Sequence, residues 1–251
     1  MKKNKIIIAN WKMYLSTSEA IKFITQNYDK LTNWAEKNLE LIICPSPTDL
    51  YQIKKIIEGS EIFIGSQITS NHHSGSFTGQ ISPKSLKYIG CSHCIVGHSE
   101  HLKYLGEKER NIIPKIELLL ELDIVPIICF GEEEKTIEPI KEIEKYMQPI
   151  LKLLQKKAKF ITQKQIIFAY EPRWAIGSGE AAKNKHIEII TSWLKTKIQN
   201  MSNSWKIIYG GSVSIKTIES LLKIDNIDGF LIGKASSSFQ EFKKLVDLIL
   251  K

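Results

Sequence analysis

Arginine is almost missing from this chain. Arg110 and Arg173 are the two arginines among 251 residues, so lysines provide nearly all of the positive charge behind the formal net charge of +8. These lysines are scattered among acidic residues, a pattern typical of a solvated surface. No nucleic-acid-reading motif accompanies them, so we predict no nucleic-acid partner. A net positive charge still favours the approach of a small anionic substrate.

Long hydrophobic runs are also lacking. No apolar stretch approaches the roughly 20 residues of a membrane-spanning helix. The segment from Met1 to Ala9 begins like a signal peptide, with lysines before Ile6. Its apolar run is well short of the about 7–15 residues that such a peptide needs. The sequence therefore predicts no membrane contact and a cytoplasmic protein.

Cysteine is scarce, and its placement argues against disulfides and metal. Three of the four cysteines lie within or at the end of apolar runs, which predicts buried free thiols in a reducing compartment. The four are Cys44, Cys91, Cys94 and Cys129. The spacing from Cys91 and Cys94 to His98 and His101 resembles a metal site but fits no common zinc pattern. We predict no metal.

Short runs rich in β-branched residues alternate with amphipathic segments. The runs are apolar on both faces, as in parallel strands covered by helices. Strands are predicted at 5–9, 40–44, 62–67, 94–96, 124–130, 165–170, 206–209 and 229–232. Helices are predicted at 16–36, 103–122, 133–157, 185–199, 214–222 and 236–250. Ser16 with Glu19 forms a capping-box pattern at the first helix.

This alternation predicts the α/β class and a (β/α)8 TIM barrel, with eight parallel strands and outer helices. A doubly wound open sheet is the alternative, but it usually has a glycine-rich turn after the first strand, where this chain has Asn10-Trp11-Lys12-Met13. The dinucleotide-like Gly177-x-Gly179-x-x-Ala182 begins well past a strand end, so we reject it and predict no cofactor. No linker divides the chain, which predicts one domain over residues 1–251.

In such a barrel, functional residues lie at the carboxyl ends of the strands. These ends are polar, charged and glycine-rich in this sequence. They carry Asn10, Lys12, Ser46, Gln67, His98, Ser99, Glu100, Gly131, Glu132, Glu171, Gly210-Gly211-Ser212 and Gly233-Lys234. The strand ends therefore form one candidate site.

Glu171 is the most informative of these residues. It ends an apolar strand and is followed by Pro172, an aromatic residue and the turn Gly177-Ser178-Gly179. That order fits a proton-abstracting base held rigidly beneath a movable lid. Taken alone, the carboxylate fits a structural ion pair equally well.

The other strand ends favour the catalytic interpretation. His98 precedes a predicted helix start, which disfavours the cationic imidazole and leaves a neutral hydrogen-bond donor. Lys12 is an ordinary surface lysine or a cation for a developing oxyanion, and Asn10 is a turn residue or an amide donor to the same oxygen. The glycine turns at Gly210-Gly211 and Gly233 are suited to phosphate binding through backbone N–H groups.

The chain resembles the triosephosphate isomerase family over nearly its whole length. The blocks that carry the resemblance are Ala9-Asn10-Trp11-Lys12-Met13, Ser76-Phe77-Thr78-Gly79, Val96-Gly97-His98-Ser99-Glu100, Cys129-Phe130-Gly131-Glu132, Ala169-Tyr170-Glu171-Pro172, Trp174-Ala175-Ile176-Gly177, Tyr209-Gly210-Gly211-Ser212-Val213 and Asp228-Gly229-Phe230-Leu231-Ile232-Gly233. The family interconverts dihydroxyacetone phosphate and glyceraldehyde 3-phosphate in glycolysis and gluconeogenesis without a cofactor. It is itself a standard example of a glutamate base with a neutral histidine electrophile and a closing loop.

The resemblance implies a role for each site residue. Glu171 would be the base and His98 the electrophile, while Lys12 and Asn10 would stabilise the oxyanion with support from Glu100. The phosphate would be held at Gly177, Ser212, Gly233 and Lys234. The lid would comprise Ala175, Ile176, Gly177, Ser178 and Gly179. Family members are usually homodimers in which the loop around Thr78 reaches into the partner's site, so a homodimer is expected here as well.

Several positions depart from the family pattern. The family usually has Ser-Glu-Arg-Arg where this chain has Ser99-Glu100-His101-Leu102, and Glu in place of Gln80. Loss of that arginine together with the acid leaves no orphan charge near the expected interface. Arg173 replaces an aliphatic residue at the lid hinge, and Lys234 replaces a common glycine. Another phosphosugar barrel enzyme and a catalytically altered phosphosugar-binding barrel remain the alternatives.

Overall fold

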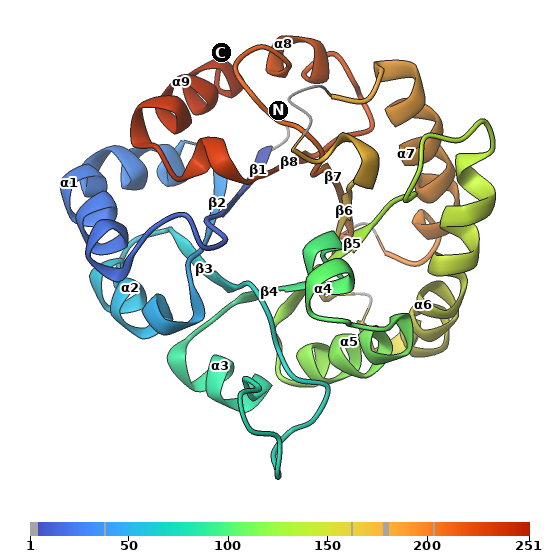
Figure 1. The fold of residues 1–251 in the computed structure, drawn as a ribbon, viewed down its shortest axis with the longest axis horizontal. Coiled ribbons are helices and arrows are strands. Elements are labelled where there is room, and N and C mark those ends of the chain that lie inside the picture. Colours follow the sequence, from blue (N-terminus) through green and yellow to red (C-terminus); the bar gives the residue numbers. More distant parts are fainter. Residues whose placement is uncertain (1–4, 38, 162, 178–180, 203) are drawn as a thin grey trace.

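Eight parallel strands pair in sequence order, and the last pairs with the first to close a barrel (Figure 1). The computed structural model describes residues 5–37, 39–161, 163–177, 181–202 and 204–251. The strands are β1 (Lys5–Asn10), β2 (Leu39–Cys44), β3 (Phe63–Ser66), β4 (His93–Val96), β5 (Val125–Phe130), β6 (Ile167–Tyr170), β7 (Lys206–Tyr209) and β8 (Gly229–Ile232). The predicted (β/α)8 barrel is confirmed.

The strands are buried on both faces, which explains why their sequences do not alternate between apolar and polar residues. In β1, Ile6 and Ile8 face the barrel interior and belong to one buried cluster with residues such as Ile42, Ile127 and Leu231. Ile7 and Ala9 face outward and join the larger core beneath the helices. The barrel is therefore filled by side chains, and its open space lies beyond the strand ends.

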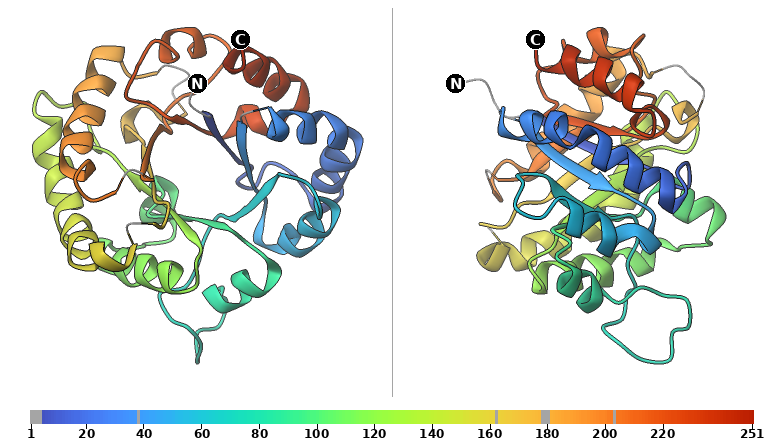
Figure 2. Two further views of the ribbon diagram at one scale, coloured as in Figure 1. Left: turned by 180° about the vertical axis from the view of Figure 1, so that it is seen from behind. Right: turned by 90° about the vertical axis from the view of Figure 1, so that its left-hand side faces the viewer.

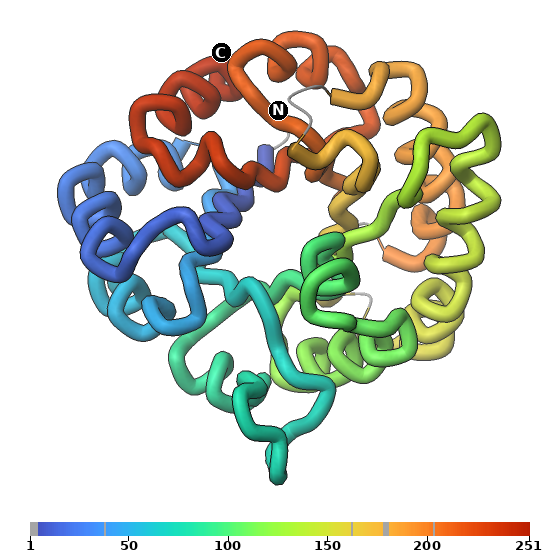
Figure 3. The backbone as a smooth tube through the Cα atoms, viewed as in Figure 1, coloured from blue at the N-terminus to red at the C-terminus, as the bar shows by residue number. Residues whose placement is uncertain are grey.

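The helices form a ring around the barrel (Figures 2 and 3). They are α1 (Thr17–Glu36), α2 (Leu50–Ile56), α3 (Pro83–Ile89), α4 (Ser99–Tyr104), α5 (Ile112–Glu121), α6 (Pro139–Ile161), α7 (Asn184–Ile198), α8 (Ile218–Leu221) and α9 (Phe239–Ile249), with short 3-10 turns at Pro47–Asp49 (η1), Glu109–Asn111 (η2), Arg173–Ala175 (η3) and Lys234–Ser236 (η4). The predicted capping box at Ser16 and Glu19 is confirmed. No helix in these described ranges is long and apolar enough to cross a membrane.

Three helix predictions were wrong in their extent. Of the helix predicted at 214–222, only Ile218–Leu221 forms a helix, α8. The single helix predicted at 103–122 is divided into α4 and α5, because Gly106 adopts a φ of +64° that a continuing helix does not allow. The helix predicted at 133–157 instead begins at Pro139, a residue suited to a first turn because it lacks an N–H group. Two helices of seven residues, α2 and α3, were not predicted at all.

All four cysteines are free and buried, as predicted. Burial raises the pKa of the Cys91 thiol to about 12, and it also raises the pKa of Cys44 and Cys129 well above the ordinary thiol range. Thiols of this kind stay protonated near neutral pH and act as small apolar side chains.

Barrel closure predicts a specific sensitivity at Gly229. A Cβ atom added there would lie 1.9 Å from the carbonyl oxygen of Ile6, the residue of β1 that pairs with Gly229 of β8. We expect Gly229→Ala to lower the free energy of unfolding in urea by about 3 kcal/mol, near the upper end of overpacking effects. In the control Gly59→Ala, the new Cβ meets nothing within 4 Å. It should cost about 1 kcal/mol for its left-handed backbone, and equal costs for the two variants would contradict this account.

Candidate active site

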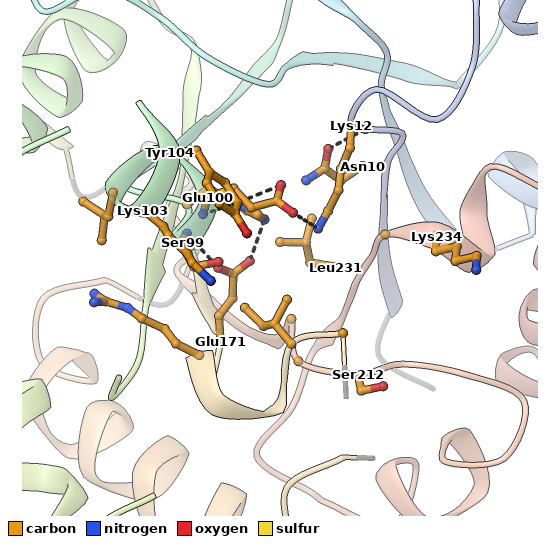
Figure 4. Close-up of a pocket in the computed structure, with 18 of the residues that line it drawn as sticks. Asn10, Lys12, Ser99, Glu100, Lys103, Tyr104, Glu171, Ser212, Leu231 and Lys234 are labelled. Carbon is orange, nitrogen blue, oxygen red and sulfur yellow. Dashed lines mark hydrogen bonds and ion pairs between the residues drawn. The ribbon is translucent and has the colours of Figure 1, made fainter. Parts of the chain in front are cut away.

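The carboxyl ends of the strands surround a cavity of about 1320 Å³ (Figure 4). The cavity is lined by residues from the loops after β1, β4, β6, β7 and β8. Among them are Asn10, Lys12, His98, Glu100, Glu171, Ile176, Gly177, Ser212, Gly233 and Lys234. The structure thus brings the predicted catalytic and phosphate-binding residues into one space. Of the predicted lid, Ala175 is buried in η3, whereas Ser178 and Gly179 lie outside the described residues.

Glu171 follows β6 directly and is held in a buried position, with 2% of its surface exposed. Its backbone N–H donates to the carbonyl oxygen of Phe130, 2.7 Å away. Neighbouring glycines leave room for it, because a Cβ at Gly131 would lie 1.9 Å from its carbonyl oxygen and a Cβ at Gly210 would lie 2.9 Å from its Cγ. The carboxylate therefore has a fixed place at the rim.

His98 lies opposite Glu171, with 3.3 Å between His98 Nε2 and Glu171 Oε1. It caps α4, and the backbone N–H of Glu100 donates to His98 Nδ1 at 3.1 Å. Because Nδ1 accepts, the proton of the neutral ring is on Nε2, which faces Glu171. Burial lowers the pKa of His98, and Lys12 and His101 lower it further against the opposing effect of Glu171. The result is a neutral imidazole that donates toward the cavity.

Lys12 provides the cation of the site. Its Nζ lies 2.7 Å from Glu100 Oε1, and its backbone N–H donates to Asn10 Oδ1 at 3.1 Å. Lys12 has a φ of +48°, which is uncommon for a residue with a side chain and marks local strain. Gln67 stabilises this conformation by donating to the carbonyl oxygens of Lys12 at 2.9 Å and Cys44 at 3.1 Å. The Lys12 side chain extends toward Glu100 in the cavity (Figure 4).

The loops after β7 and β8 form the other side of the cavity. Ser212 and Gly233 line it together with Lys234. The Lys234 side chain points away from Glu171 (Figure 4).

Sequence analysis placed Glu132 at a strand end but did not identify what it binds. Glu132 is fully buried and accepts hydrogen bonds from Tyr170 Oη, Trp174 Nε1 and His186 Nε2. Burial, and then the Glu132 charge, raises the pKa of Tyr170 far above its ordinary value. These partners are far apart in the sequence, so the strand-end position of Glu132 was the one available signal.

Two of the departures from the family pattern, His101 and Gln80, have polar neighbours within the same chain, although His101 Nδ1 makes no hydrogen bond among the described residues. His101 Nδ1 lies 3.6 Å from Glu107 Oε2, and Lys115 forms a second ion pair with Glu107. Gln80 Oε1 accepts from Ser70 Oγ at 2.6 Å. The two substituted positions therefore have separate partners within one chain.

Arg173 packs its guanidinium group over the ring of Tyr146, with 5.9 Å between the guanidinium carbon and the ring centroid. It also lines the cavity, so this hinge residue adds positive charge at the cavity's edge.

Thr78 lies apart from the cavity. It is exposed on a loop that extends away from the barrel, teal at the bottom of Figure 1 and visible again in Figure 2. Within the same loop, the rings of His72 and Phe77 stack with centroids 3.8 Å apart. The predicted interface residue therefore does not contribute to the site of its own chain.

Comparison with known proteins extends the match over the whole barrel. The family model described as triosephosphate isomerase matches residues 5–249. The triosephosphate isomerase of Dictyoglomus turgidum is 36% identical over 249 residues, covering 97% of this chain and 99% of that protein. That of Endomicrobium trichonymphae is 36% identical over 248 residues, covering 96% and 97%. That of Wigglesworthia glossinidia brevipalpis is 33% identical over 260 residues, covering 100% and 98%.

The geometry predicts the tautomer and charge of His98. Because its pKa is lowered below the ordinary 6.5, the ring should be neutral at pH 6.5 and above, with the proton on Nε2. ¹⁵N NMR of histidine-labelled protein measures this directly, with the resonances assigned by a His98→Gln variant. A doubly protonated ring at pH 6.5, or a proton on Nδ1, would contradict the assignment.

Proposed function

Because the chain belongs to the triosephosphate isomerase family, we propose that it interconverts dihydroxyacetone phosphate and D-glyceraldehyde 3-phosphate by proton transfer through an enediolate. The observation that carries the mechanism is the pair of His98 Nε2 and Glu171 Oε1, which face each other at 3.3 Å in one cavity with Lys12. The reaction is an aldose–ketose isomerisation and belongs to glycolysis and gluconeogenesis. A cytoplasmic location, which goes with that pathway, stays a prediction.

Glu171 is the proton-abstracting base. Among the described residues, none donates a well-aligned hydrogen bond to its Oε1, so this oxygen keeps a lone pair for a substrate C–H. The backbone N–H of Ser99 lies 3.4 Å from Oε2 and orients the carboxylate. A base at a strand end, fixed by its own backbone hydrogen bond, can approach the carbon next to the carbonyl with little reorganisation.

His98, Lys12 and Asn10 stabilise the charge that this step creates. The neutral imidazole donates from Nε2 to the carbonyl oxygen and then moves protons between the two enediolate oxygens. The Lys12 ammonium group offsets the negative charge on the oxygen, and Asn10 is an amide donor to the same oxygen. Glu100 holds Lys12 in place through their 2.7 Å ion pair. Backbone groups at Gly177, Ser212, Gly233 and Lys234 bind the phosphate.

The segment from Ala175 to Gly179 acts as a lid over this site. An enediolate phosphate that is exposed to water can eliminate phosphate, so closure protects the intermediate. The hinge before the lid is held by its own contacts, since the Arg173 N–H donates to the carbonyl oxygen of Glu132 at 3.0 Å. This arrangement allows movement of the lid while Glu171, just before the hinge, stays in place.

Removal of the base predicts a large loss of turnover. In a coupled assay with glyceraldehyde 3-phosphate, Glu171→Gln should lower kcat by about 10²- to 10⁴-fold, the usual contribution of a positioned general base. The control Glu188→Gln changes an exposed residue of α7 and should leave kcat unchanged. Normal turnover by Glu171→Gln would refute the mechanism. A wild-type chain that binds the substrate without converting it would point instead to a catalytically altered phosphosugar-binding barrel.

The active form is a homodimer. The Thr78 loop projects from the barrel, and large apolar side chains are exposed on two separate loops, with Met13 93% and Phe77 37% exposed. A second copy of the chain would cover such surfaces. In this arrangement the Thr78 loop of one protomer completes the site of the other.

Light scattering should therefore report about twice the 28.7 kDa of one chain for the wild type. Thr78→Asp should shift the population toward monomer and lower kcat/KM, because a buried charge at an interface is unfavourable. Thr25→Asp places the same charge on the exposed face of α1 and should change neither. Elution of the wild type at monomer mass with full activity would rule out the dimer.

A further inference from the structure

One fully buried carboxylate connects the two ends of the lid. Trp174 lies in η3, just before the lid, and His186 lies in the first turn of α7, beyond it. Trp174 Nε1 and His186 Nε2 each lie 2.8 Å from the same oxygen, Oε1 of Glu132. Their rings meet edge to face, with centroids 5.9 Å apart.

The third donor to Glu132 does not belong to the lid. Tyr170 Oη lies 3.0 Å from Oε1 and 3.1 Å from Oε2, and Tyr170 is the last residue of β6, directly before Glu171. Glu132 thus joins the strand that carries the base to both flanks of the lid. Movement of Trp174 therefore changes the hydrogen bonds of Glu132. Glu132 also binds Tyr170, the residue directly before Glu171.

A buried carboxylate that loses a donor carries a large energetic penalty. Suppose that the indole N–H of Trp174 leaves Oε1 during lid movement. Without His186, Tyr170 would then be the one side-chain donor left to Glu132 among these three. With His186 present, Oε1 keeps a second donor at 2.8 Å, which limits this penalty. Two donors that share one oxygen also weaken each other, so His186 makes the Trp174 bond easier to break.

We propose that His186 is a positioning residue for lid movement, which keeps Glu132 satisfied while Trp174 leaves and returns to Oε1. This inference rests on the lid of the proposed function. His186 is not among the residues that line the cavity. It acts through Glu132 and Trp174 alone.

The test compares three substitutions at His186 with a control at its neighbour. His186→Leu removes the donor, His186→Gln keeps an amide N–H close to the position of Nε2, and His186→Asn carries an amide too short to reach it. Lys185→Leu is the matched control, since Lys185 is exposed in the same turn of α7. Two quantities are measured: kcat and KM for isomerisation, and the NMR position of the Trp174 indole N–H without substrate, assigned with Trp174→Phe.

In His186→Leu and His186→Asn we expect kcat to fall about tenfold, the effect of one hydrogen bond to a charged group, with a smaller change in KM. The Trp174 indole proton should move downfield, because its bond to Glu132 is no longer shared. His186→Gln should restore both quantities to within about twofold of the wild type, and Lys185→Leu should change neither.

Unchanged kcat and indole position in both His186→Leu and His186→Asn would overturn the proposal. The proposal would also be overturned if kcat fell while the Trp174 indole proton did not move and His186→Gln did not restore kcat. That result would indicate a purely structural role. If the wild type shows no isomerase activity, the proposed function fails, and the indole position alone decides on His186. A downfield shift in Leu and Asn but not in Gln then supports the shared bond, and its absence overturns it.

Discussion

The 3.3 Å approach of Glu171 Oε1 to His98 Nε2 is the contact on which the rest of the site depends. His98 follows β4 and Glu171 follows β6, two strands separated only by β5, and the curvature of the barrel turns the two side chains toward each other. Both are almost fully buried. In such surroundings a cationic imidazole would lose its hydration, which is why burial lowers the pKa of His98 and keeps the ring neutral. A neutral donor facing a carboxylate with a free lone pair is suited to moving protons to and from a carbonyl compound.

Supporting contacts hold Glu171 and His98 without filling the cavity that they share with the loops after β7 and β8. Glu100 pairs with Lys12, and its backbone N–H sets the tautomer of His98. Glu132 holds Tyr170 on one side of Glu171 and the lid hinge on the other. Buried polar groups of this kind are stabilising only when every partner is present. Through Glu132, these contacts extend to His186, which does not line the cavity.

Much of this arrangement could be predicted from the sequence because it depends on local signals. Strands apolar on both faces, a capping residue such as Ser16 and strand ends that carry polar groups all follow from neighbouring residues. The interruption between α4 and α5 was missed although Gly106 is a local signal for a helix end. The inward turn of Glu107 to pair with Lys115 could not be predicted, because it depends on tertiary packing. The Glu132 cluster was missed for a similar reason. Its donors Trp174 and His186 follow it by 42 and 54 positions, and no spacing rule connects them.

The central claim is that Glu171 and His98 move protons rather than assist a direct hydride shift between carbons. The most direct measurement is NMR of the product after turnover of glyceraldehyde 3-phosphate in D₂O. A carboxylic acid formed on Glu171 exchanges its proton with solvent before it returns one to the enediolate. The account therefore predicts dihydroxyacetone phosphate that carries deuterium on C1. Complete conversion to a product without solvent deuterium would contradict it.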